Sequence, residues 1–127
     1  MIFVLYEMDV LAEKQKEFIQ AVPMILEETS AQSGCLRHCL CRDIADESRF
    51  FIIQTWRDQP ELDAYWRSDR FGTFLGTFHL LKEPPDIQIY AVSFKAGIEA
   101  IKAVRAKAPL PNDGKIEKQT HTYRHNR

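Results

Sequence analysis

Residues 34–71 read GCLRHCLCRDIADESRFFIIQTWRDQPELDAYWRSDRF, and this stretch decides the fold. Two candidate strands, residues 35–42 and 49–56, flank a polar turn over residues 43–48. A turn this short joins antiparallel neighbours, because parallel strands need a crossover of about a dozen residues or more. The stretch therefore predicts an antiparallel hairpin.

Two helices are expected after the hairpin. Asp58, with Glu61 three residues later, makes a capping-box pattern, and Pro60 lies in the first turn, where a missing N–H has no cost. We therefore predict a helix over residues 59–67. Ser68 is expected to cap the next helix. Its apolar positions recur at helical spacing, at Phe71, Phe74, Leu75 and Phe78.

The segments on either side complete the pattern. Residues 2–8 form an N-terminal strand, and a helical pattern begins at Ala12. Pro23 lies inside that helix, and an interior proline costs about 3 kcal/mol, so we expect a kink or a fresh start there. Pro84-Pro85 end the last helix of the domain, and residues 87–92 form a fourth strand.

The element order is therefore β-α-β-β-α-α-β. It predicts an α+β fold close to the ferredoxin-like β-α-β-β-α-β domain, with a four-stranded antiparallel sheet. We assign residues 1–95 to this domain and residues 96–127 to an extra C-terminal helix and a polar tail. The tail has too few large apolar residues to offset its own ordering entropy, so we expect it to be mobile or fixed by a partner subunit.

The composition fits one soluble domain. A chain of 127 residues with 45% hydrophobic residues can bury a single core. The net charge is −1 and the basic residues are scattered, so nucleic-acid binding is not expected. No apolar run approaches the ~20 residues that cross a bilayer, and the N-terminus lacks a leader pattern. We therefore expect a cytoplasmic protein without membrane partners.

The three cysteines lie at odd positions of one predicted strand, so we expect Cys35, Cys39 and Cys41 to share a sheet face. A metal or redox cluster does not fit them. The sequence offers no fourth ligand nearby, and the spacing is not C-x-x-C. We interpret them as buried free thiols and predict no metal site.

These features together resemble the antibiotic biosynthesis monooxygenase family over about residues 1–95. The resemblance rests on the Gly34-Cys35 pair that opens the second strand, on Trp56 at the end of the third, and on Ser68 followed by Phe71. It implies a dimeric α/β barrel in which the sheets of two subunits pair. It also implies a pocket between each sheet and its helices.

The resemblance further implies a type of chemistry. Members of the family act on aromatic polyketides, quinols, haem or small signalling sugars, and several use dioxygen without flavin, metal or haem. The substrate, as an electron-rich phenolate or enolate, then passes an electron to oxygen. Such an enzyme needs a dry aromatic pocket and a few polar groups to bind and deprotonate the substrate.

We expect His38 and Tyr65 to be the catalytic residues. His38 has a pKa near neutrality that suits a proton acceptor, and Tyr65 would orient a substrate oxygen. For the aromatic candidates, ordinary core packing is the alternative. The expected contacts to a small aromatic or quinol-like substrate are Tyr6, Gln54, Trp56, Trp66, Arg67, Phe71, Phe74, Phe78 and His79.

The chain also departs from the family pattern. Tyr65 and Arg70 stand where many relatives have histidine, so a mechanism built on those histidines does not carry over. Leu75 stands at the iron-ligand position of haem-degrading relatives, and the only asparagines, Asn112 and Asn126, lie in the tail. Haem degradation by that route is therefore not expected.

Three functions remain open. The leading one is a homodimeric, cofactor-independent monooxygenase that oxidises a quinol or a polyphenol- or polyketide-like small molecule with dioxygen. The second is a non-catalytic small-molecule-binding or stress-response barrel, and the third is an isomerase of a small signalling sugar. A cavity faced by His38 or Tyr65 favours the first, and a lining of carbon atoms alone favours the second.

We predict that the purified protein is colourless and free of metal. The sequence has no Gly-rich phosphate loop and no metal-ligand spacing, and Leu75 cannot ligate haem iron. An absorption spectrum with elemental analysis checks this. A Soret band, a flavin spectrum or a stoichiometric metal retained through purification would contradict it.

Overall fold

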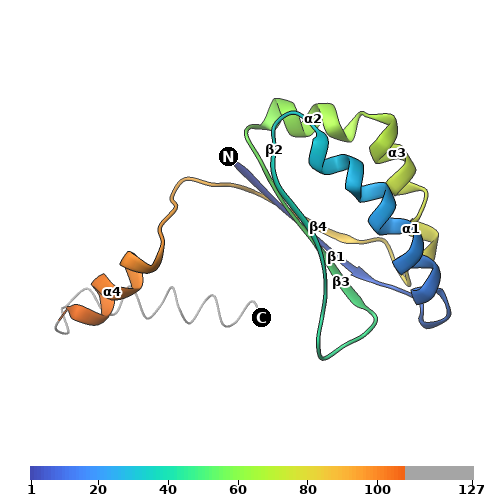
Figure 1. The fold of residues 1–127 in the computed structure, drawn as a ribbon, viewed down its shortest axis with the longest axis horizontal. Coiled ribbons are helices and arrows are strands. Elements are labelled where there is room, and N and C mark those ends of the chain that lie inside the picture. The colour runs from blue at the N-terminus through green and yellow to red at the C-terminus, as the bar shows by residue number, and fades with distance from the viewer. Residues whose placement is uncertain (108–127) are drawn as a thin grey trace. The chain divides into compact units, whose positions relative to one another are not determined.

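The structure is a computed structural model that describes residues 1–107, so the predicted tail beyond that point lies outside the described residues. The chain divides into two compact units, one over Met1–Ser93 and one from Phe94 onward. The second contains α4 (Ile98–Ala106). The elements of the first (Figure 1), in which η marks a 3-10 turn, are β1 (Ile2–Asp9), η1 (Ala12–Lys14), α1 (Gln15–Glu27), η2 (Glu28–Ala31), β2 (Cys35–Arg42), β3 (Arg49–Trp56), α2 (Gln59–Trp66), α3 (Asp69–Leu75), η3 (Phe78–Leu80) and β4 (Asp86–Ala91).

The four strands form one antiparallel sheet in the order β2-β3-β1-β4. β1 is therefore a central strand, and Tyr6 in its middle pairs with Ile52 of β3 and Ile87 of β4. The helices α1, α2 and α3 cover one face of this sheet (Figure 1). The predicted α+β class and ferredoxin-like order are confirmed.

The core lies between that face and the helices. Every second residue of β1 and β3 is buried there, as a strand covered on one side requires. The helices contribute residues at helical spacing. The buried side chains of this layer include Val4, Tyr6, Met8, Phe18, Val22, Leu26, Phe50, Ile52, Trp56, Leu62, Tyr65, Phe71 and Phe74.

Helix α1 runs through Pro23 as a single element, so the expected fresh start there is wrong. Pro23 is exposed, whereas Phe18, Val22 and Leu26 of the same helix are buried. Burying these three side chains contributes roughly 1.5–3 kcal/mol each, which exceeds the cost of one interior proline.

Helix α3 ends at Leu75 and not at Pro84-Pro85, which corrects the second predicted helix end. Gly76 is its C-terminal cap, and the Thr77 hydroxyl donates to the Phe74 carbonyl at 2.7 Å. The predicted apolar stripe therefore divides. Phe74 is buried, but Leu75 is 46% exposed.

A bulge between Cys35 and Arg37 changes the predicted arrangement of the thiols. Because of this register shift, Cys35 lies on the helix side of β2, while Cys39 and Cys41 lie on the opposite face. The expectation that the three cysteines share one face is therefore wrong. The Sγ atoms of Cys39 and Cys41 are 3.7 Å apart, and all three cysteines are free.

Gly34 is required where the chain enters β2. Its φ of 85° lies in the left-handed region, and a Cβ at this position would lie 2.6 Å from Glu61 Cβ of α2. The Gly34 carbonyl accepts a hydrogen bond from the Arg57 amide at 2.8 Å. This contact ties the start of β2 to the loop after β3.

The capping predictions are confirmed. The Asp58 side chain accepts from the Glu61 amide at 3.0 Å, and the Ser68 hydroxyl accepts from the Phe71 amide at 3.2 Å. Within residues 1–107, none of the helices combines the length and hydropathy needed to cross a bilayer.

The second face of the sheet carries apolar residues that no helix of the first unit covers (Figure 1). Phe3 and Leu5 of β1 lie beside Phe51 and Ile53 of β3 on this outer face, and all four are half-buried. A contiguous apolar surface of this kind is typical of a protein–protein interface.

We therefore predict that the protein is a dimer that buries this outer face. Light scattering at micromolar concentration should give about twice the chain mass of 14.8 kDa. Ile53→Lys should shift the particle to the monomer mass, because it places a charge on the outer face. Ile44→Lys makes the same change in the fully exposed β2–β3 turn and should remain dimeric. A wild-type monomer would contradict the prediction.

Candidate functional site

The predicted aromatic residues form a closed cluster between the sheet and the helices α2 and α3. Tyr65 stacks on Trp56, with ring centroids 5.0 Å apart. Phe71 meets Tyr65 edge-on at 5.2 Å, and Phe74 lies 5.9 Å from Phe71 and 6.0 Å from Tyr6. All five side chains are buried. In this structure they pack against one another as core.

A buried polar chain crosses the same layer. Trp56 Nε1 donates to Gln54 Oε1 at 3.0 Å, and Gln54 Nε2 lies 3.1 Å from His38 Nδ1. Gln54 and His38 are direct partners in the β3–β2 ladder. His38 Nε2 is buried and has no hydrogen-bond partner among the described residues. Burial lowers the pKa of His38, which favours the neutral imidazole.

Tyr65 is buried beside Phe71, as expected, and its hydroxyl lies 3.1 Å from Thr29 Oγ1 of η2. Burial raises the pKa of Tyr65, and the side chains of Thr29 and Gln54 offset only part of this effect. The phenol therefore stays protonated at neutral pH and can donate a hydrogen bond. Its part in any chemistry remains a prediction.

Trp66, Tyr6 and Phe78 also join helices to the sheet. The Trp66 Nε1 group donates to the Tyr6 hydroxyl at 3.1 Å, and burial raises the pKa of Tyr6. The Phe78 ring meets Phe74 edge-on at 5.1 Å. These contacts account for the three predicted aromatics as supports of the core.

Two predicted substrate contacts lie outside this network. Arg67 is the exposed C-terminal cap of α2, and His79 is exposed in η3, where its Nδ1 lies 2.8 Å from the Gly76 carbonyl. Neither is hydrogen-bonded to the buried polar chain in the described structure. Over residues 1–107, no group of three His, Cys, Asp or Glu side chains is placed to hold a metal ion.

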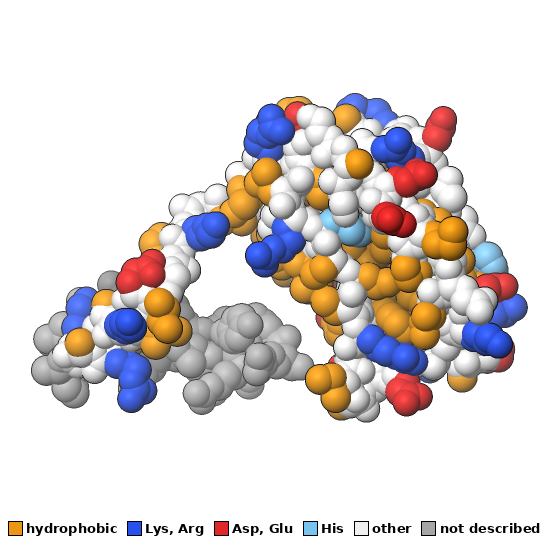
Figure 2. Space-filling model, in the orientation of Figure 1, with side chains coloured by type: hydrophobic (Ala, Val, Ile, Leu, Met, Phe, Trp, Pro, Cys, Tyr) orange, Lys and Arg blue, Asp and Glu red, His pale blue; other side chains and the backbone are white. Residues whose placement is uncertain are grey.

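A surface cavity of about 350 Å³ lies between α1 and the edge strand β2, and His38 lines it. We call it the α1–β2 groove. Figure 2 shows hydrophobic side chains gathered on this face between α1 and the β2–β3 hairpin. The groove's apolar walls come from Pro23, Met24, Leu26 and Leu40, and its polar groups include Glu27, Ser30 and His38. A smaller cavity of about 220 Å³ shares Pro23 and Leu40 with it.

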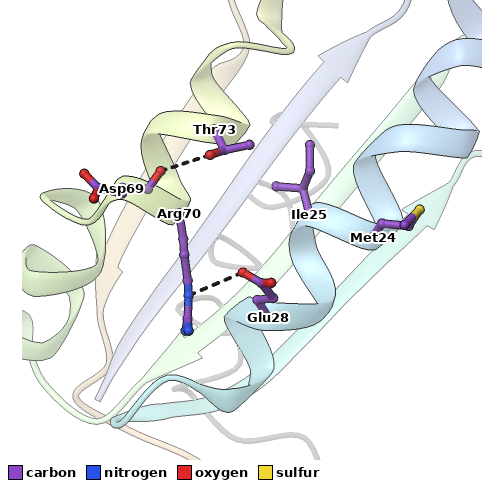
Figure 3. A pocket seen from close by; sticks show the side chains of 6 residues that line it. All are labelled: Met24, Ile25, Glu28, Asp69, Arg70 and Thr73. Carbon is purple, nitrogen blue, oxygen red and sulfur yellow. Dashed lines mark hydrogen bonds and ion pairs between the residues drawn. The ribbon is translucent and has the colours of Figure 1, made fainter.

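A second pocket, of about 380 Å³, lies between α1 and α3 (Figure 3). Its side chains include Met24 and Ile25 of α1, and Arg70 Nε of α3 pairs with Glu28 Oε2 at 3.4 Å. Both partners of this ion pair are largely exposed, so it contributes little to stability. None of the predicted site residues lines this pocket, so the α1–β2 groove is the better candidate.

Sequence reasoning missed three polar side chains near the site. Thr29 holds the Tyr65 hydroxyl, while Glu27 and Ser30 line the groove. All three belong to the segment that ends the first helix, where polar residues are ordinary. The only signal was a Thr and a Ser in that turn, and nothing in the pattern relates them to residues far along the chain.

Comparison with known proteins agrees with this architecture. A family model described as antibiotic biosynthesis monooxygenase matches residues 1–76. An uncharacterized protein of Synechocystis is 26% identical over 82 residues, which make up 64% of this chain and 56% of that protein. The N-terminal EF-hand calcium-binding protein 1 of Homo sapiens is 31% identical over 68 residues, 54% of this chain and 19% of that protein. The chain thus spans 56% of the first relative's length and 19% of the second's.

A solved structure gives the same fold. A Nitrosomonas europaea protein named as a candidate antibiotic biosynthesis monooxygenase superposes with a TM-score of 0.70. The match covers 74% of this chain and 100% of that one, at 19% identity. At this identity the likeness supports the fold alone.

We predict that the Tyr65–Thr29 hydrogen bond stabilises the fold modestly. Tyr65→Phe and Thr29→Val should each lower the free energy of unfolding by about 1 kcal/mol, and by no more than about 1.5 kcal/mol. The double variant should cost less than the sum, because neither partner is then left unpaired. Urea unfolding of the four proteins checks this. Strict additivity would show that the two hydroxyls do not interact.

Proposed function

Since the chain belongs to the antibiotic biosynthesis monooxygenase family, we propose that it is a cofactor-independent monooxygenase of a quinol- or polyphenol-like small molecule. The observation that carries the proposal is His38. It lines the α1–β2 groove and has a buried Nε2 without a partner among the described residues. Unpaired buried polar groups are rare in folded proteins and mark sites where a ligand or a reaction uses them.

The groove has the features of a small aromatic site. Its volume of about 350 Å³ is near the lower end of the roughly 300–1,000 Å³ that small-molecule sites span. Apolar side chains such as Leu26 and Leu40 offer flat contacts to a ring, while His38 and Ser30 offer polar contacts to its oxygen atoms. A ring with one or two oxygen substituents matches this lining.

The proposed reaction balances without a prosthetic group. A quinol and dioxygen give a hydroxyquinone and water: one oxygen atom enters the ring, the other leaves as water, and the substrate supplies all the electrons. The protein binds the anionic form of the substrate, which passes electrons to oxygen, and holds the two reactants together. A donor at the phenolate oxygen stabilises the charge that makes this possible.

The second function, a non-catalytic small-molecule-binding barrel, is favoured by a different observation. Trp56, Tyr65, Phe71 and Phe74 fill the layer between sheet and helices with aromatic contacts. The human relative is named for calcium binding, and the matched part is a small share of it. A homodimer in the cytoplasm, where the three free cysteines stay reduced, is part of both proposals. The sugar isomerase has no observation of its own and is not proposed.

Oxygen uptake tests the proposal. The wild-type protein, with chelator present and flavin absent, should consume dioxygen with at least one member of a panel of benzene- and naphthalene-quinols. Labelled dioxygen should place one heavy atom in the product. His38→Asn should lower turnover about 100-fold, the usual effect of losing one oxyanion donor, while Ile44→Lys should not. Ligand binding without oxygen uptake across the panel would favour the non-catalytic barrel.

A further inference from the structure

The amide of Gln54 has its orientation fixed by Trp56. An indole N–H is a donor only, and Trp56 is fully buried, so its partner has to be an acceptor. The Trp56 Nε1 group meets Gln54 Oε1 at 3.0 Å. The other end of the amide, the NH2 group, therefore faces His38 Nδ1 at 3.1 Å.

This orientation selects one tautomer of His38. An NH2 group can only donate, so Nδ1 has to accept, and the single proton of a neutral ring then lies on Nε2. The other tautomer would set Nδ1–H against the NH2 of Gln54. Rotating the amide to relieve that contact would set its NH2 against the indole N–H of Trp56, which is equally unfavourable.

We propose that Trp56 and Gln54 are positioning residues that hold His38 as an Nε2–H donor, so that a molecule bound in the α1–β2 groove presents a carbonyl or phenolate oxygen to it. The occupant of the groove rests on the proposed function, whereas the tautomer does not. The assignment changes the role expected of His38 from its ordinary pKa. It is a hydrogen-bond donor to the substrate and not the acceptor of the substrate's proton.

Two observations support this role. His38 Nε2 is buried without a partner among the described residues, so an oxygen atom delivered by a ligand would satisfy it. Burial also lowers the pKa of His38, which keeps the ring neutral and the tautomer defined. Because Nε2 is covered, binding includes a local movement of the groove's lining, in which Met24 is 71% exposed.

The consequence for the substrate is a requirement for an acceptor. A donor at Nε2 stabilises the anionic form of a phenol, so it lowers the pKa of the bound phenol without taking its proton. The proton then leaves to solvent or to a buffer molecule. Apolar rings of the same shape that lack an oxygen acceptor gain nothing from His38.

Nitrogen NMR of the full chain, labelled with 15N, tests the tautomer directly at neutral pH. Long-range correlations distinguish a protonated from an unprotonated ring nitrogen, and loss of signals in His38→Asn assigns them among the four histidines. Wild type should carry its proton on Nε2. Gln54→Glu accepts from Trp56 and from Nδ1–H, so the proton should move to Nδ1. Trp56→Phe frees the amide, so both tautomers should be present. Gln20→Glu adds the same charge at an exposed position of α1 and should leave the spectrum unchanged.

A pair of matched probes tests the acceptor requirement. 1-Indanone carries a ring carbonyl and no electrophilic alkene that would react with the thiols, and indane is the same skeleton without the oxygen. 1-Indanone should shift the Nε2 resonance of wild type, and indane should not. Binding of 1-indanone to Gln54→Glu should be roughly three- to tenfold weaker, the size of one hydrogen bond.

The proposal is overturned if wild type carries the proton on Nδ1, or if neither Gln54→Glu nor Trp56→Phe changes the tautomer. Equal binding and equal shifts from indane and 1-indanone would overturn the acceptor requirement. Should Gln54→Glu fail to fold, Trp56→Phe carries the same test. These readouts need no turnover, so absence of oxygen uptake would refute the monooxygenase and leave the donor assignment standing.

Discussion

The rest of the site depends on one buried amide. Gln54 lies on the helix side of β3, in a layer that is otherwise mostly apolar, and its side chain is 1% exposed. An amide buried at such a place lowers stability unless its groups are paired. Trp56 and His38 supply those partners, and both positions follow from strand geometry. Trp56 is two residues along the same face, and His38 is directly across the ladder.

The register of β2 is therefore constrained by more than apolar contacts. A one-residue slip would turn His38 to the other face and leave Gln54 without its second partner. The bulge between Cys35 and Arg37, together with Gly34 in its left-handed conformation, sets where this register begins. The glycine–cysteine pair that identified the family thus has a structural role: it places the histidine.

Most of the fold follows from local patterns in the sequence. Period-two burial in the strands and the caps at Asp58 and Ser68 are local signals, so strand order and helix starts are predicted well. The errors occur where tertiary contacts decide. Burial of one face of α1 carries the helix through Pro23, and local capping at Gly76 ends α3 early. The site is less predictable, because composition cannot tell a packed aromatic from a pocket wall. Thr29 and the α1 wall of the groove are remote in sequence from the strand residues they meet.

A crystal structure of the protein with 1-indanone bound tests the account most directly, since it locates the occupant and its hydrogen bond together. We predict that the ring lies in the α1–β2 groove with its carbonyl oxygen about 2.7–3.2 Å from His38 Nε2, and that Gln54 still joins Trp56 to Nδ1. A ring bound only in the pocket between α1 and α3, or an oxygen turned away from His38, would contradict it.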